Sequence, residues 1–422
     1  MKIIAYPPKS EWPILLSRPT QSMANIEKNV APILDKVRQE GDAALREFAL
    51  KFDKIELKEI AIPQKTIEAA ELLLSEDLKA AIQQAYTNIR AFHQIQHQPA
   101  QKVETMPGVT CWRRSVPIEK VGLYIPGGSA PLFSTVLMLG VPAQLAGCRE
   151  IVLCTPSAHP AILYAAKLVG VTQIFRVGGA QAIAAMAYGT ESIPKVYKIF
   201  GPGNQYVTAA KMLLAKEGMA IDMPAGPSEV AIYADKTAIP AFVAADLLSQ
   251  AEHGEDSQVL LVSTDKKLLA SINLALMTQL ESLPRKEIAR KAIENSKAIL
   301  VENDSEAIDL LNEYAAEHLI LSVKNAEAIS EKIINAGSIF LGNYTPESCG
   351  DYASGTNHTL PTNGHARAYS GVSLDSFVKK ITIQHINEEG IRNIGKTVET
   401  MAEAENLHAH QRAVSLRLSS LK

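Results

Sequence analysis

Between residues 121 and 301 the chain alternates short apolar runs with longer stretches of helical spacing. A strand, a crossover helix and a second strand form a parallel pair, so the alternation predicts an α/β protein built on parallel sheets. The number of such units indicates two sheets rather than one. The runs read as strands are 121–125, 151–154, 174–177, 195–200, 230–233, 259–262 and 299–301.

Helical segments flank this central part. Residues 20–100 carry apolar side chains at helical spacing, with Ser75 as the N-cap of one helix. After residue 376 two more helices are predicted, joined by a left-handed turn at Asn406. A helical hairpin at the end of an α/β protein cannot bury both of its faces alone. A second subunit is therefore a candidate partner.

Composition excludes several classes of protein. The net charge of −3 gives no electrostatic footprint for nucleic acid or an anionic membrane. Prolines at positions 7 and 8 break the N-terminus too soon for a signal peptide, and no apolar run is long enough to span a bilayer. Four cysteines without a CxxC spacing indicate free thiols in a reducing compartment. We expect a cytoplasmic protein.

The stretch Ser-Gln-Ala-Glu-His-Gly at 249–254 ends a predicted helix that begins near Pro240. Asp246, Gln250 and His253 lie at i, i+4 and i+7 and project from one face of that helix. An imidazole, an amide oxygen and a carboxylate on one face could begin a divalent-metal site. The alternative is a histidine that only caps the last carbonyls of the helix.

Three glycine-rich turns, 126–128, 178–181 and 201–204, each follow a strand-like run. Glycine lets backbone amides approach an anion, and the next helix N-terminus favours negative charge. The turns therefore suit a nucleotide diphosphate, although none is a G-x-G-x-x-G fingerprint. Tight turns without a ligand remain the alternative.

Two further stretches carry acid–base or ligand groups. Residues 350–358 are rich in small residues and are predicted to form a loop in which Asp351 and His358 are candidate ligands. A solvated polar loop is the alternative. Glu317 and His318 are adjacent and so point in different directions, which suits two separate acid–base tasks better than one shared ion. They could also be an exposed carboxylate and a capping histidine.

The C-terminal hairpin contains one more candidate ligand. His410 shares a helix face with Leu407 and Val414, an arrangement more typical of a buried core histidine than of a ligand. Glu405, just before the Asn406 turn, reads as a surface carboxylate. The residues give no support for a thiol nucleophile.

Taken together, these stretches closely resemble the histidinol dehydrogenase family over nearly the whole chain. Asn363 is one departure, standing where a tyrosine is common before Gly364. The motifs that carry the resemblance are 121–128, 201–204, Ala-Gly-Pro-Ser-Glu-Val at 225–230, 249–254, Glu-His-Leu at 317–319, 350–358 and Leu-His-Ala-His at 407–410.

The resemblance implies two Rossmann-like parallel-sheet domains in a crossed homodimer. An N-terminal arm would comprise residues 1–20. Residues 21–110 with 227–375 would form the first domain, which carries most zinc ligands. Residues 111–226 would form the second, NAD-binding domain, and residues 376–422 a helical dimerisation arm.

The resemblance also implies a four-electron oxidation of L-histidinol through L-histidinaldehyde to L-histidine, with two NAD⁺ and one water consumed. Glu317 and His318 would be the catalytic bases. Because the arm crosses over, Glu405 and His410 would enter the partner's active site. One zinc ion would be held by Gln250, His253, Asp351 and His410. Substrate would contact Ser228, Gln250, His253, His318, Asp351, Glu405 and His410. NAD would contact Tyr124, Gln181 and Asn204.

Three other functions stay open from the residues alone. A relative of the same fold could oxidise another polyol, such as a sulfonated propanediol, although Glu405 would repel an anionic substrate. A zinc hydrolase could use Glu317 to activate water, but that leaves the glycine turns unexplained. The third is a non-catalytic metal-binding protein.

Overall fold

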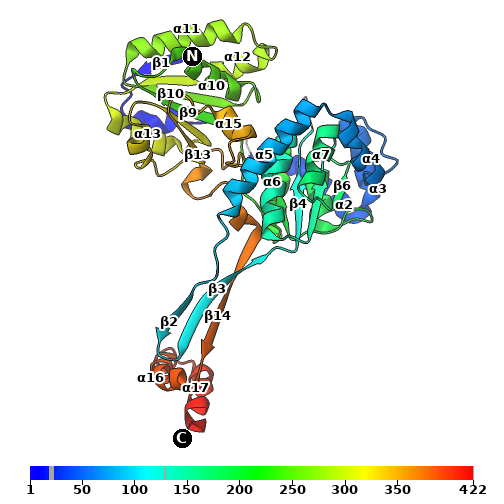
Figure 1. Ribbon diagram of the computed structural model, residues 1–422, viewed down its shortest axis with the longest axis vertical. Coiled ribbons are helices and arrows are strands. Elements are labelled where there is room, and N and C mark those ends of the chain that lie inside the picture. The colour runs from blue at the N-terminus through cyan, green and yellow to red at the C-terminus, as the bar shows by residue number, and fades with distance from the viewer. Residues whose placement is uncertain (19–22, 128–129, 422) are drawn as a thin grey trace.

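A computed structural model describes residues 1–18, 23–127 and 130–421 of the chain. It contains two separate parallel sheets, each covered by helices, and a long arm that extends away from both (Figure 1). The predicted α/β class with two parallel sheets is thereby confirmed. Among the described residues, every helix is too short or too polar to cross a membrane.

The first domain is built on a six-stranded parallel sheet. Strands β9 and β10 are buried at every position, as expected for a parallel sheet with helices on both faces. Neighbouring residues serve opposite faces: Ile232 packs in one core and Tyr233 in the other. The strand order is β1 (Lys2–Ala5), β11 (Lys297–Leu300), β10 (Gln258–Ser263), β9 (Glu229–Ala234), β12 (His318–Ser322) and β13 (Ser338–Leu341).

Helices cover both faces of this sheet. One face packs against α10 (Pro240–Ala251), α11 (Lys266–Leu280) and α12 (Lys286–Glu294). The other packs against α1 (Trp12–Leu15), α13 (Asp304–Tyr314) and α14 (Ala326–Ser330). Residues 1–18 therefore belong to the first domain, with β1 as its edge strand, and do not form the separate N-terminal arm that was expected.

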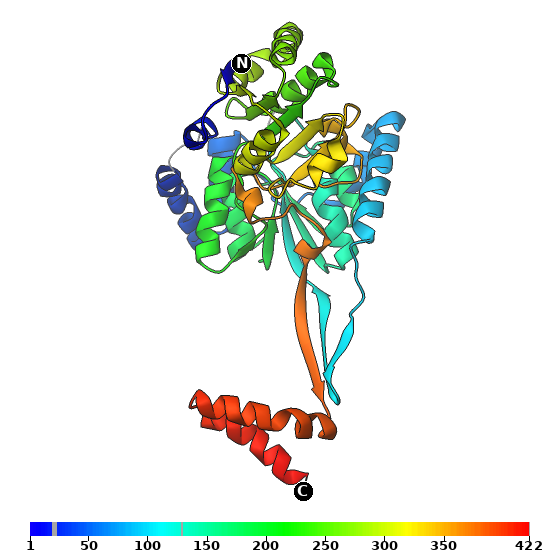
Figure 2. The same cartoon turned by 90° about the vertical axis from the view of Figure 1, so that its left-hand side faces the viewer.

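The second domain is built on a five-stranded parallel sheet, whose strands are shorter. Figure 2 shows its helices on both sides of the sheet. The strand order is β6 (Gln173–Phe175), β5 (Glu150–Cys154), β4 (Lys120–Tyr124), β7 (Lys198–Phe200) and β8 (Ala220–Ile221). The covering helices are α2 (Met23–Glu40), α3 (Asp42–Phe48), α8 (Gly179–Tyr188) and α9 (Gln205–Lys216) on one face, and α4 (Gln64–Ala69), α5 (Glu76–Gln94), α6 (Phe133–Ala146) and α7 (Pro160–Leu168) on the other.

Assigning residues 21–110 to the first domain was wrong. Helices α2 to α5 lie on the second sheet, where Val30 joins the core of Val152 and Ile89 joins the core of Leu123. Apolar periodicity shows which face of a helix is buried, but it does not show which sheet the face meets. Those helices therefore complete the second domain.

The extended arm is a three-stranded antiparallel ribbon with a helical hairpin at its far end (Figures 1 and 2). Its strands are β2 (Lys102–Met106), β3 (Val109–Pro117) and β14 (Val378–Ile386), and its helices are α16 (Glu388–Ala404) and α17 (His408–Ser420). Residues 376–422 are thus not wholly helical, because they begin with β14. Asn406 has a φ of 59°, which confirms the predicted left-handed turn.

Candidate active site

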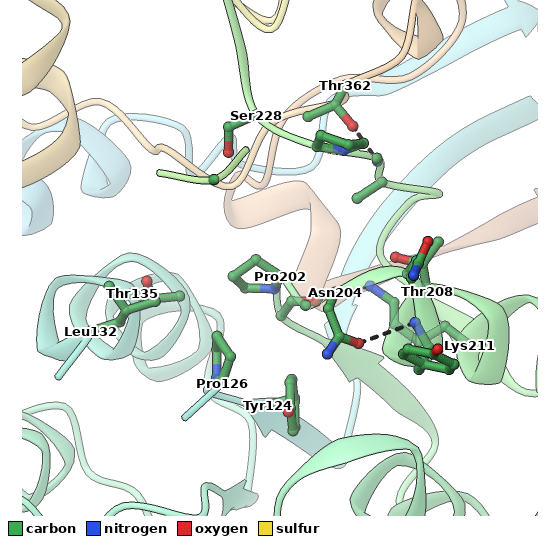
Figure 3. A pocket seen from close by; sticks show the side chains of 18 of the residues that line it. Tyr124, Pro126, Leu132, Thr135, Pro202, Asn204, Thr208, Lys211, Ser228 and Thr362 are labelled. Carbon is green, nitrogen blue, oxygen red and sulfur yellow. Dashed lines mark hydrogen bonds between the residues drawn. The ribbon is translucent and has the colours of Figure 1, made fainter. Parts of the chain in front are cut away.

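The carboxyl edge of the second sheet and the amino edge of the first sheet line one cavity. Tyr124 ends β4, whereas His318 begins β12, and both contribute to its wall. Figure 3 shows Tyr124 and Asn204 on one side and Ser228 on the other. The volume of about 1590 Å³ exceeds the roughly 300–1,000 Å³ of a single-ligand pocket. A dinucleotide and a small substrate could therefore share it.

Of the eleven residues that the family resemblance assigns to the site, nine line this cavity and two do not. Glu405 and His410 are exposed and lie at the far end of the extended arm (Figure 1). The prediction that His410 would resemble a buried core residue is wrong for the single chain, since α17, described throughout, has no buried residue. The nine are Tyr124, Gln181, Asn204, Ser228, Gln250, His253, Glu317, His318 and Asp351.

Helix α10 runs back from the carboxyl end of β9, so its C-terminus arrives at the amino edge of the sheet. This places Gln250 and His253 in the cavity. The Gln250 side chain is only 1% exposed, whereas His253 is open to solvent. The predicted helix end at Gly254 is three residues late, because α10 stops at Ala251.

A cluster of possible metal ligands forms beside the end of α10. Atoms of His253, Glu347 and Asp351 lie within 4.8 Å of one another, the only such group found among the described residues. His253 and Asp351 were expected from the sequence, whereas Glu347 was missed and His410 is absent. The missed signal was a helix start at Thr345-Pro346-Glu347, which places Glu347 one turn before Asp351.

The predicted loop at 350–358 is therefore partly helical. Helix α15 runs from Glu347 to Tyr352 and includes Asp351. The prediction of His358 as a candidate ligand is also not supported by its contacts. Its Nδ1 lies 2.8 Å from the Asp351 carbonyl oxygen and its Nε2 lies 3.0 Å from Thr135 Oγ1. With both ring nitrogens occupied, His358 fits a structural role better than that of a ligand.

Glu317 and His318 lie at the start of β12 and are both buried. Glu317 Oε2 accepts a hydrogen bond of 3.0 Å from the Glu229 N–H and lies 3.6 Å from His318 Nδ1. His318 Nε2 lies 3.4 Å from Asp351 Oδ1, within ion-pair range but without the alignment of a hydrogen bond. The alternative of an exposed Glu317 and a capping His318 is therefore wrong.

Three buried atoms of this group have no hydrogen-bond partner in the part of the chain that the structure describes. They are both ring nitrogens of His318 and Asp351 Oδ1. Buried polar atoms in native proteins almost always have partners, and exceptions often mark a ligand or ion site. All three belong to residues that line the cavity.

Burial and charge shift the acid–base properties of these groups. Burial raises the pKa of Glu317 to about 7, against the opposing charge of His318. Burial would lower the pKa of His318, but the carboxylates of Glu347, Glu317 and Asp351 outweigh it and raise that pKa to about 10. Glu317 can therefore exchange a proton near neutral pH. It does so beside two further acidic side chains, Glu347 and Asp351.

On the other wall, Tyr124 OH accepts a 3.0 Å hydrogen bond from the Gly179 N–H. Asn204 lines the cavity and caps α9 through its Oδ1, so its amide nitrogen takes no part in the cap. Gln181 is buried in the first turn of α8. Within the turn at 126–128, Gly128 lies outside the described residues.

A buried ion pair supports the turn at Gly201. Lys211 and Asp222 are paired with almost no exposure, Lys211 Nζ donates to the Gly201 carbonyl at 3.0 Å, and Asp222 Oδ2 accepts from the Gly201 N–H at 2.8 Å. Gly201 has a φ of +132°, and a Cβ there would lie 2.1 Å from the Tyr124 carbonyl oxygen. Only glycine fits this position. Neither Lys211 nor Asp222 was singled out from the sequence.

Comparison with known proteins agrees with this geometry. The histidinol dehydrogenase family model matches residues 16–418. Histidinol dehydrogenases of Bacteroides thetaiotaomicron and Bacteroides fragilis are 60% and 57% identical to this chain, and each alignment covers all of both proteins. The crystal structure of histidinol dehydrogenase from Elizabethkingia anophelis matches with a TM-score of 0.97 at 55% identity, covering 100% of this chain and 98% of that one. The chain belongs to the histidinol dehydrogenase family.

Proposed function

We propose that this chain oxidises L-histidinol to L-histidine through L-histidinaldehyde, with reduction of two NAD⁺ and consumption of one water. The observation that carries the proposal is one cavity with two walls. One wall holds the buried Glu317–His318 pair beside a possible metal cluster, and the other holds the glycine turns. Family membership and relatives named histidinol dehydrogenase support the same activity.

Zinc fits the residues beside α10. His253 and Asp351 offer a nitrogen and a carboxylate oxygen, and Asp351 Oδ1 is buried without a hydrogen-bond partner in the described chain. Gln250 and His410 of the partner subunit would complete a set of four neutral and anionic donors of the kind zinc takes. Bound zinc would hold the amine and imidazole of histidinol and offset the charge of the carboxylates, and NAD⁺ would accept the hydrides.

The protein side chains would then handle the protons. With the carboxylate charge offset, His318 can act in its neutral form and accept the hydroxyl proton of the substrate. Glu317 can take a proton from the water that hydrates the aldehyde, since its pKa of about 7 lets it alternate between both forms. Ser228, in the cavity wall, would hydrogen-bond the substrate. Glu405 of the partner subunit would accept a hydrogen bond from the imidazole N–H of the substrate.

The second wall would bind the dinucleotide. Tyr124, Gln181 and Asn204 surround the glycine turns at the carboxyl edge of the second sheet, the edge at which α/β proteins bind their ligands. Closing the cavity around both ligands would also keep the reactive aldehyde from escaping between the two oxidations.

We further propose that the extended arm crosses to a second copy of the chain. In the single chain, Glu405 and His410 are exposed at the end of the arm, and the apolar residues Met401, Leu407 and Leu416 of the hairpin are exposed as well. Docking on a second copy would bury this surface and deliver both polar residues to the cavity of that copy.

The direct test combines metal analysis of the purified protein with the absorbance of NADH after addition of L-histidinol and NAD⁺. We expect about one zinc per subunit and formation of L-histidine. Chelation should abolish NADH formation, and added zinc should restore it. Turnover of a sulfonated propanediol in preference to histidinol, or full activity of protein shown to be metal-free, would contradict the proposal.

Cysteine chemistry is not expected to contribute. None of the four cysteines, all within the described residues, lines the cavity, and burial raises the pKa of Cys148 to about 12. Replacing each cysteine in turn by serine should therefore leave kcat within about tenfold of the wild-type value, or about 1.4 kcal/mol. A loss of several orders of magnitude at one cysteine would instead indicate a covalent thiohemiacetal in the second oxidation.

A further inference from the structure

Glu347 is a buried carboxylate that the proposed reaction does not use. It begins α15, is only 1% exposed, and has no lysine or arginine of the described chain among the charges that act on it. Its partner is the side chain of Gln250, itself 1% exposed. The Gln250 amide is oriented by its hydrogen-bond partners: with its oxygen facing a donor and its nitrogen facing an acceptor, the nitrogen donates to both carboxylate oxygens of Glu347, the longer contact being 3.2 Å.

The other end of the same amide is also held. Gln250 Oε1 accepts a 3.0 Å hydrogen bond from the Glu229 N–H, a donor that it shares with Glu317 Oε2 at the same distance. A backbone N–H can only donate, so the contact with Glu229 requires the amide oxygen on that side and leaves the nitrogen for Glu347. One lone pair of Oε1 is used by Glu229, and the second is left for a ligand in the cavity that Gln250 lines.

Helix spacing links this contact to the metal cluster. Glu347 and Asp351 are at i and i+4 on α15 and so lie on the same face. Asp351 reaches His253 while Glu347 reaches Gln250, which joins α15 to the end of α10 at two points. We propose that Glu347 is a positioning residue that fixes the Gln250 amide with its oxygen available to the divalent metal. The inference rests on the zinc site of the proposed function.

Direct ligation by Glu347 is the rival explanation, because its carboxylate lies within 4.8 Å of the ligand atoms of His253 and Asp351. The two roles predict different coupling between Glu347 and Gln250. A positioning residue loses its effect once Gln250 is removed, whereas an independent ligand keeps its effect.

The test measures the zinc dissociation constant by competition with a chromophoric chelator. The proteins are the wild type, Glu347→Gln, Gln250→Ala and the double variant. Loss of a residue that orients a metal ligand typically costs about 10–100-fold in affinity, and we expect that loss for Glu347→Gln. Adding Glu347→Gln to Gln250→Ala should change the constant by less than about threefold. Additive losses, or an unchanged constant in the single variant, would overturn the inference.

Two further variants guard against misfolding. Glu347→Asp keeps the charge but draws the carboxylate back by one methylene, so it should weaken zinc binding in the same direction. Ser348→Ala changes an exposed neighbour on the same helix and should bind zinc as the wild type does. Thermal unfolding of the metal-free proteins identifies any variant that fails to fold. If the wild-type protein does not bind zinc, both the zinc assignment and this inference are overturned. If the wild type binds zinc and Glu347→Gln binds it equally well, only the inference is overturned.

Discussion

Replacing Glu317 by glutamine is expected to lower the rate of histidinaldehyde oxidation by about 10²–10⁴-fold, the range that a positioned general base contributes. Glutamine has nearly the same shape and keeps an oxygen that can accept from the Glu229 N–H, the contact that holds Glu317 at 3.0 Å. It cannot take a proton from water. The variant should therefore fold and bind zinc and NAD⁺ normally while failing at the hydration step.

The measurement is a stopped-flow assay of NADH formed from histidinol and, separately, from supplied histidinaldehyde. The oxidation of histidinol to the aldehyde uses His318 and should be less affected than the second oxidation. Glu331→Gln, an exposed glutamate at the end of α14, is the matched control and should retain full activity. Wild-type rates of aldehyde oxidation in the Glu317 variant would exclude it as the base.

The two sheets could be predicted from the sequence because their strands are short apolar runs, such as those of β9 and β10, that alternate with helical stretches. The strands of the extended arm were not predicted, because exposed strands lack the apolar periodicity that identifies an element. Strand β14 is buried at none of its positions, and β3 carries Arg113 and Arg114 in its middle. Neither has the apolar alternation that identifies a strand, since the arm has little core of its own.

The site could be predicted only in part, for a related reason. Gln250, His253 and Asp351 were found through motifs, but their meeting depends on α10 returning to the amino edge of the first sheet, and spacing along the chain does not encode that return. Glu347 was missed because the start of α15 just before the predicted loop at 350–358 was not recognised, so Glu347 was not placed one turn before Asp351. Lys211 was missed because a buried lysine under a turn looks, in sequence, like any exposed helical lysine.

The crossed arm predicts that two variants that are inactive alone in L-histidine formation restore each other's activity when mixed. His410→Ala and Glu317→Gln proteins should each form almost no L-histidine, yet recover L-histidine formation when mixed, unfolded and refolded together. Half of the dimers formed at random are mixed, and each mixed dimer has one intact site, so about a quarter of the wild-type activity should return. The intact site combines Glu317 from one chain with His410 of the partner subunit.

A second mixture provides the control for this recovery. Glu317→Gln and His318→Ala alter the same wall of the cavity, at the start of β12, so no pairing of these two chains contains an intact site. That mixture should stay inactive under the same refolding conditions. His410 is exposed at the end of the extended arm, where it can reach a second chain. A shared site should therefore restore activity in the first mixture and leave the second mixture inactive. If both mixtures stay inactive while refolded wild-type protein regains its rate, the arm does not complete the partner's cavity.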